Sequence, residues 1–249
     1  MKILLQIILL MVIISCSNNN NQVIRDNKHL QHKTKTDNKT AIDTVLERNS
    51  PDSLDLTMHQ LFIDTTRNSK YFKQILDWKP NKFDKQETDY YFKEISKTFD
   101  SKKVDLKEFS GDWISIHSLN DEYVAYNPIN GIDWRFTLTD SSINHYRIEA
   151  DAEVISKVIS LNQKELILEL RTIPQKSKNQ ISYLRIKKTK VPYLYSIQNS
   201  EILDFDKTEY INLVTPLESL VEFNLVVSDA PQLVHSTVKF DKIERKKLE

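Results

Sequence analysis

The chain has 249 residues, with 35 lysines and arginines against 35 aspartates and glutamates, and it contains one cysteine and two glycines. The balanced charge argues against a nucleic-acid partner, because domains that bind nucleic acid are usually basic. A single cysteine excludes an intramolecular disulfide and any multi-cysteine metal site. Two isolated glycines, Gly111 and Gly131, exclude a glycine-rich phosphate loop and a dinucleotide-binding fingerprint.

Residues 1–15 are typical of a secretory signal. Lys2 supplies a positive charge, and the run from Ile3 to Ile14 is apolar apart from Gln6. At about 1.5 Å per residue, this run is too short to span a hydrocarbon core of about 30 Å. The segment therefore predicts a cleaved signal peptide.

The end of the apolar run, Ile13-Ile14-Ser15-Cys16, resembles the lipobox of bacterial lipoproteins. In that family the cysteine receives a diacylglyceryl group, and the amine that cleavage frees is usually acylated. The resemblance implies lipidation of Cys16 and a membrane partner, since two or three acyl chains hold a protein durably on a bilayer. The Asn- and Lys-rich usage is similar to lipoproteins of the Bacteroidota, which implies a place in the cell envelope, on the periplasmic face or surface of the outer membrane. An ordinary signal peptide followed by a chance cysteine is the alternative.

Residues 16–55 have the composition of a flexible tether. Up to residue 40 the stretch consists of Asn, Lys, Asp, Gln and His with almost no apolar side chain. Such a segment buries too little surface to offset the entropy lost on ordering.

Residues 56–103 predict a helical lead before the main domain. Asn68-Ser69 is expected to cap a first helix that ends before Pro80, because the residue before a proline is disfavoured in a helix. A second amphipathic helix is expected over residues 86–99. The aromatic residues of both segments predict core contacts.

From residue 104 to 249 the apolar pattern changes to a period of two, which predicts an antiparallel β domain. A short helix with a capping box at 215–218 and a last strand at 236–240 are also expected. Strands without helix-length gaps form a meander, which protects its edges best by closing into a barrel. The alternative is an open antiparallel sheet packed on the two helices. The expected strands are 113–118, 122–126, 134–139, 143–148, 154–160, 165–171 and 181–188.

The first of these strands opens with Phe109-Ser110-Gly111-Asp112-Trp113, which resembles the G-x-W signature of lipocalin-like barrels. The resemblance implies that Trp113 plugs the closed base of the barrel and that Gly111 allows close packing there. The arginine that stacks on this tryptophan in the family could be Arg171 or Arg185. Further along the chain, the interior-facing residues Trp134 and Phe136 are expected to line a possible ligand cavity.

Few residues are candidates for chemistry. His117, His145 and His235 are isolated from a nucleophile and are expected to have packing roles. The charge run 187–190 is expected to be a solvated strand end, and a phospholipid contact is the alternative. We therefore expect no catalytic, cofactor-binding or metal-binding residues and no enzyme activity.

Three classes of function remain, of which an enzyme is the least favoured, and the barrel interior distinguishes the other two. The first is a lipid-anchored binding module for an apolar or amphiphilic ligand. The alternative is an envelope protein that binds another protein, including a toxin-immunity lipoprotein. A cavity lined by Trp134 and Phe136 would favour the first, whereas a filled barrel or an exposed apolar patch would favour the second.

Overall fold

The computed structural model describes residues 60–128, 132–173, 180–207, 210–229, 238, 240–243 and 245–248. The predicted signal peptide, Cys16 and the tether lie outside the described residues, as does most of the strand expected at 236–240. Among the described residues, no helix is long and apolar enough to cross a membrane.

The elements in chain order are β1 (Gln60–Asp64), α2 (Lys70–Leu76), α3 (Lys82–Ser96), η1 (Lys107–Phe109), β2 (Gly111–Leu119), β3 (Glu122–Asn127), β4 (Arg135–Leu138), β5 (Ser142–Tyr146), β6 (Asp151–Leu161), β7 (Glu165–Arg171), β8 (Ile181–Lys188), β9 (Tyr195–Ser200), η2 (Phe205–Lys207), β10 (Asn212–Pro216), η3 (Leu217–Glu222), β11 (Asn224–Asp229) and α4 (Arg245–Leu248).

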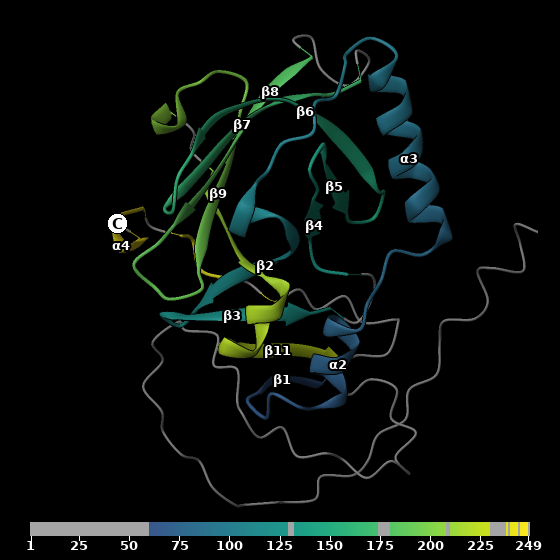
Figure 1. Ribbon diagram of the computed structural model, residues 1–249. Coiled ribbons are helices and arrows are strands. Elements are labelled where there is room, and N and C mark those ends of the chain that lie inside the picture. The colour runs from purple at the N-terminus through teal and green to yellow at the C-terminus, as the bar shows by residue number, and fades with distance from the viewer. Residues whose placement is uncertain are drawn as a thin grey trace, which may run out of the picture. The chain divides into compact units, whose positions relative to one another are not determined.

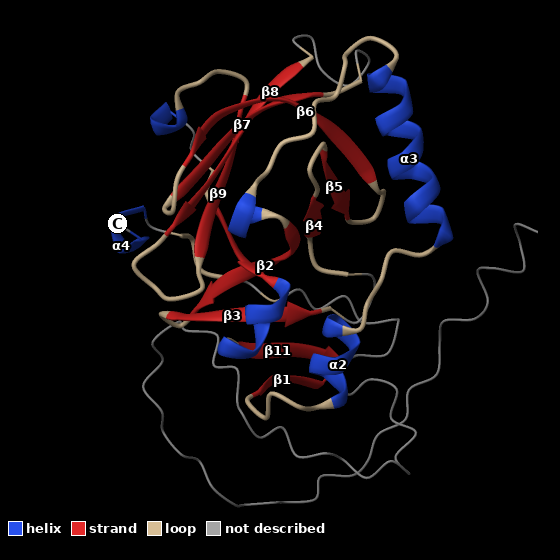
Figure 2. Ribbon diagram, in the orientation of Figure 1, coloured by secondary structure: helices blue, strands red, loops and turns tan. Residues whose placement is uncertain are grey.

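Eight antiparallel strands form a closed barrel (Figures 1 and 2). From β4 to β10 each strand pairs with the next, and β2 pairs with both β10 and β4 to complete the ring. This closure confirms the predicted lipocalin-like meander and excludes the open sheet. Two register shifts in β6 help the sheet to curve, because bulges increase the local bend and twist of a strand.

The side chains that point into the barrel form its core. Along β7 buried and half-buried residues alternate, so Leu166, Leu168 and Leu170 face inward while Glu165 and Glu169 face outward. The segment before β2 contributes Leu106 and Phe109 to the same core, so η1 covers one end of the barrel. We call this end the base, and the opposite end, where β5 and β9 finish, the mouth.

A smaller side sheet shares strand β2 with the barrel. Residues 111–116 of β2 pair with barrel strands, whereas His117–Leu119 pair with β3. Asn120 and Asp121 join β2 to β3 with φ values of 52° and 66°, which a two-residue hairpin turn requires. β3 then pairs with β11 in parallel, and β11 pairs with β1 in antiparallel orientation.

The helices cover the outside of the strands. Ser69 caps α2 as predicted, with its hydroxyl accepting from the amides of Tyr71 and Phe72. α3 begins earlier than expected, because Asn81 and Asp84 form a capping box, and it packs along β6 (Figure 1). The segment 56–103, expected as a helical lead, thus holds both helices and also β1. A second core joins α2, η3 and the side sheet to the outer face of the barrel.

Four barrel or side-sheet strands were not predicted, namely β1, β9, β10 and β11. In β9 the outward residues Ser196 and Gln198 are polar although they are buried beneath other elements. The apolar pattern in the sequence therefore did not indicate a strand there. The expected capping box at 215–218 is wrong. Thr215 belongs to β10 and its hydroxyl donates to the carbonyl of Tyr193 at 2.8 Å, so the following helix, η3, is a 3₁₀ helix without a side-chain cap.

Candidate functional site

Trp113 lies in the base of the barrel, as the resemblance implied. Its indole N–H donates to the carbonyl of Phe109 at 3.0 Å, which ties η1 to the first barrel strand. Its ring stacks on Phe136 with an interplanar angle of 2° and meets Tyr195 edge-on. These contacts give Trp113 a structural role.

Two other details of the signature differ from the expectation. The space around a Cβ at Gly111 is open, so close packing does not require a glycine there. The backbone conformation does require one, because residues with a side chain rarely adopt its φ of +125°. Neither expected arginine contacts Trp113. Arg171 lies over the ring of Phe99 and Arg185 over that of Phe205, since both side chains point out of the barrel.

Trp134 and Phe136, which were expected to line a possible ligand cavity, both face the barrel interior. Phe136 is fully buried, and its ring lies 5.4 Å from that of Trp134. Both pack with Ile155, Leu168 and other aliphatic residues of the core. The two aromatics therefore form part of the apolar core of the barrel.

A polar cavity of about 220 Å³ lies at the mouth of the barrel. His145 and Glu153 border it, with 3.3 Å between His145 Nε2 and Glu153 Oε2. Ser182 donates to the other oxygen of Glu153 at 2.9 Å. His145 Nδ1 and the indole N–H of Trp134 are buried without a hydrogen-bond partner. Glu153 thus joins His145 and Ser182 at this end of the barrel.

His117 has a carboxylate partner that sequence spacing did not reveal. Its Nε2 lies 2.7 Å from Asp133 Oδ2, and its ring stacks on Phe240 at 4.0 Å. The other oxygen of Asp133 accepts the backbone N–H of Trp134 at 2.9 Å. Both oxygens of Asp133 are thus engaged. His235, the third candidate, lies outside the described residues.

Arg135 is the most unusual group of the described chain. It follows Trp134 on β4 and points out of the barrel, yet it is only 6% exposed because α2 covers it. A guanidinium has five N–H donors. Within the described residues the group makes one hydrogen bond, to the carbonyl of Ile75 at 3.3 Å, and Nε is buried without a partner.

No carboxylate forms an ion pair with Arg135 among the described residues. Burial lowers the pKa of Arg135 to about 10, and the negative charges of Asp133 and Asp112 oppose that effect. The group therefore stays charged at neutral pH. Its main contact is the ring of Trp78, whose centroid lies 4.4 Å from the guanidinium carbon. A buried cation without an ion pair is costly, which marks the position as a candidate site.

Arg135 opens onto a cleft of about 330 Å³ between α2, the end of β3 and the start of β4. Ile75, Trp78, Pro128 and Ile132 supply apolar walls. Gln74, Asn127, Asp133 and Tyr126 add polar groups, and burial raises the pKa of Tyr126, so its hydroxyl keeps its proton. We call this the Arg135 cleft. It can accept an apolar group against Trp78 and an anion against the guanidinium.

The sequence did not single out Arg135. The alternation of Trp134, Arg135 and Phe136 places the arginine on the outer face of the strand, but nothing local shows that this face is covered. The cover comes from α2, and the bond to Ile75 spans 60 residues. Trp78 was assigned to the helical core, so neither half of the cleft could be recognised alone.

Among the described residues, no group of three or more His, Cys, Asp or Glu side chains is placed to hold a metal ion. Comparisons of the chain with protein-family models, with curated proteins and with solved structures found no match.

Proposed function

We propose that the protein is a lipid-anchored, non-catalytic binding module of the cell envelope, and that its ligand is an amphiphile with an anionic head group. The observation that carries the ligand class is the buried Arg135 guanidinium, which has four uncommitted donors and borders a cleft with apolar walls. Charge-assisted hydrogen bonds to a carboxylate, sulfonate or phosphate would satisfy those donors. The lipobox at Cys16 supports the anchor.

This proposal moves the ligand from the barrel interior to its outer face. Trp134 and Phe136 pack with apolar residues of the barrel core, which offer no cation to an anionic head group. The Arg135 cleft offers both kinds of contact that an amphiphile needs, an apolar wall at Trp78 and a cation beside it.

The test uses residues 39–249, which include every described residue, and the probe 8-anilino-1-naphthalenesulfonate, an apolar ring system with a sulfonate. Arg135→Gln should weaken probe binding by about tenfold or more, because a hydrogen-bonded charge pair contributes about 1.5–3 kcal/mol. Arg135→Lys keeps the charge but loses the planar guanidinium group. Its affinity for the probe should lie between that of the parent and that of Arg135→Gln. Arg147→Gln, which removes an exposed arginine at the mouth, is the matched control and should bind like the parent.

Stability separates a binding role from a structural one. Because Arg135 forms no ion pair with any described residue, Arg135→Gln should leave the melting temperature unchanged or higher. A variant that loses several kcal/mol of stability while the surviving fold still binds the probe would show that Arg135 is structural, and the proposed ligand site would be abandoned.

The second candidate function is binding to another envelope protein, as an immunity lipoprotein would do. The exposed apolar side chains of Ile148, after β5, and of Ile202 and Leu203, after β9, favour it. Because β5 and β9 both end at the mouth, these residues share that end of the barrel. If the parent protein binds no anionic amphiphile, this function takes precedence.

A further inference from the structure

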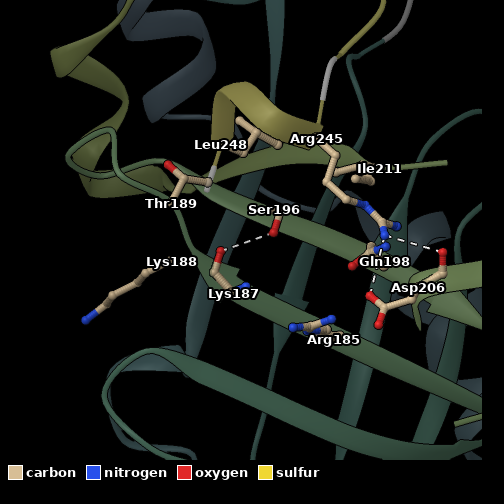
Figure 3. Close-up of a pocket in the computed structure, with 10 residues that line it drawn as sticks. All are labelled: Arg185, Lys187, Lys188, Thr189, Ser196, Gln198, Asp206, Ile211, Arg245 and Leu248. Carbon is tan, nitrogen blue, oxygen red and sulfur yellow. Dashed lines mark hydrogen bonds and ion pairs between the residues drawn. The ribbon is translucent and has the colours of Figure 1, made fainter. Parts of the chain in front are cut away.

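A second pocket, of about 120 Å³, lies on the outer face of β8 and β9 beneath α4 (Figure 3). Ser196 and Gln198 project outward from β9 into it, yet both are at least nine-tenths buried because the C-terminal segment covers them. Figure 3 shows Arg245 reaching from α4 toward Gln198 and Asp206. This pocket is remote in sequence from the Arg135 cleft and shares no lining residue with it.

Hydrogen bonds hold the walls of this pocket without any ligand. Arg245 Nη2 and Gln198 Nε2 both donate to the carbonyl of Phe205, each at 3.1 Å. Ser196 donates to the carbonyl of Lys187 at 3.3 Å. Leu248 is buried in the second core and anchors α4. The pocket is therefore preformed, which lowers the entropy cost of filling it.

Positive charge is in excess around the pocket. Its lining contains the cations Arg185, Lys187, Lys188 and Arg245 and the single carboxylate of Asp206. Arg185 pairs with Glu165 at 2.7 Å and Arg245 with Asp206 at 3.4 Å.

The two lysines differ in their surroundings. Lys188 lies 4.0 Å from Glu108, and in Figure 3 its side chain extends away from the other labelled residues. Lys187 is half-buried and has no ion pair in the part of the chain that the structure describes. Its charge is the one in the pocket that no carboxylate neutralises.

We propose that this pocket binds a phosphate group, with Lys187 as its principal cation and the guanidinium groups of Arg185 and Arg245 as further donors. A phosphate offers several acceptor oxygens and a negative charge, which match the N–H groups and the excess positive charge of the lining. The volume holds several water molecules and accepts one such group in their place. The phosphate can be free or can be the head group of an anionic lipid, and the inference does not depend on the proposed function.

Calorimetric titration of the full chain in neutral detergent tests both sources. One arm uses inorganic phosphate, and the other uses dihexanoyl phosphatidic acid, a short lipid that remains dissolved and carries a phosphomonoester. Dihexanoyl phosphatidylcholine, whose head group has no net charge, serves as the negative control. Lys187→Gln should weaken the binding of the phosphate probe by about tenfold or more, and Lys187→Arg should retain it. Raising the salt concentration should also weaken binding, because exposed charges are screened.

Lys190→Gln is the matched control, since Lys190 is exposed near the end of the same strand and does not line the pocket. Binding of phosphate in either arm that falls in Lys187→Gln but not in Lys190→Gln supports the site. Binding of phosphatidic acid alone identifies a lipid head group as the source. Absence of binding by the parent in both arms, or equal losses in the two variants, overturns the proposal; thermal melts confirm that each variant is folded.

Discussion

Trp113 connects the sequence signature to the stability of the barrel. It is fully buried and contacts η1, β4 and β9 through Phe109, Phe136 and Tyr195. Removing its side chain would leave a large cavity at the base and an unpaired carbonyl at Phe109.

Trp113→Ala should therefore lower the free energy of unfolding by about 3–5 kcal/mol, a large share of the about 5–15 kcal/mol of a typical domain. The measurement is urea-induced unfolding followed by circular dichroism. Phe83→Ala removes an exposed aromatic of α3 and should change the midpoint little. A Trp113→Ala protein as stable as this control would contradict the structural role of the signature.

Single residues also show where sequence reasoning ends. Trp113 could be placed because a short motif links it to a known fold. Arg135 could not, because its burial is produced by α2, and its unsatisfied donors appear only when both segments are in position. Lys187 was expected to be solvated, and α4 turns its surroundings into a pocket.

At the level of elements, local patterns predicted most of the strands and both long helices. Strands with one apolar face, such as β7, alternate clearly in the sequence. β9 does not, because Ser196 and Gln198 are polar and buried, and β11 does not, because Leu225, Val226 and Val227 are buried on both faces. Burial by distant segments cannot be read from local periodicity.

The first turn of α3 permits a test of local signals. Asn81 accepts from the amides of Phe83 and Asp84 at 2.7 and 3.0 Å, and Asp84 accepts from the amide of Asn81 at 2.9 Å. Asn81→Ala removes half of this box and should lower the free energy of unfolding by about 1 kcal/mol. Gln86→Ala, on the exposed side of the same helix, should have a smaller effect in the same urea titration. Equal effects would mean that the cap contributes nothing.

At the scale of the whole molecule, the anchor and the folded part make separate contributions to the proposed function. Cys16→Ala should abolish lipidation and leave an unprocessed precursor, because the modifying enzyme needs the thiol. Metabolic labelling with a palmitate analogue and fractionation of the envelope measure both effects. Asn19→Gln, in the stretch after the cysteine, leaves the lipobox intact and is the comparison. Maturation and labelling of the Cys16→Ala protein would refute the lipobox.

The order of the strands has a consequence for how the chain is made. β10 closes the barrel by pairing with β2, and β11 joins β1 to β3. Neither sheet can be completed before these strands, which lie near the C-terminal end, are available. These pairings are far apart in sequence, and contacts of that kind form late because the intervening chain must first be brought together. A ribosome must therefore release nearly the whole chain before either sheet is complete. For the exported protein that we propose, late completion of both sheets would suit passage through a translocation channel, which requires an unfolded chain.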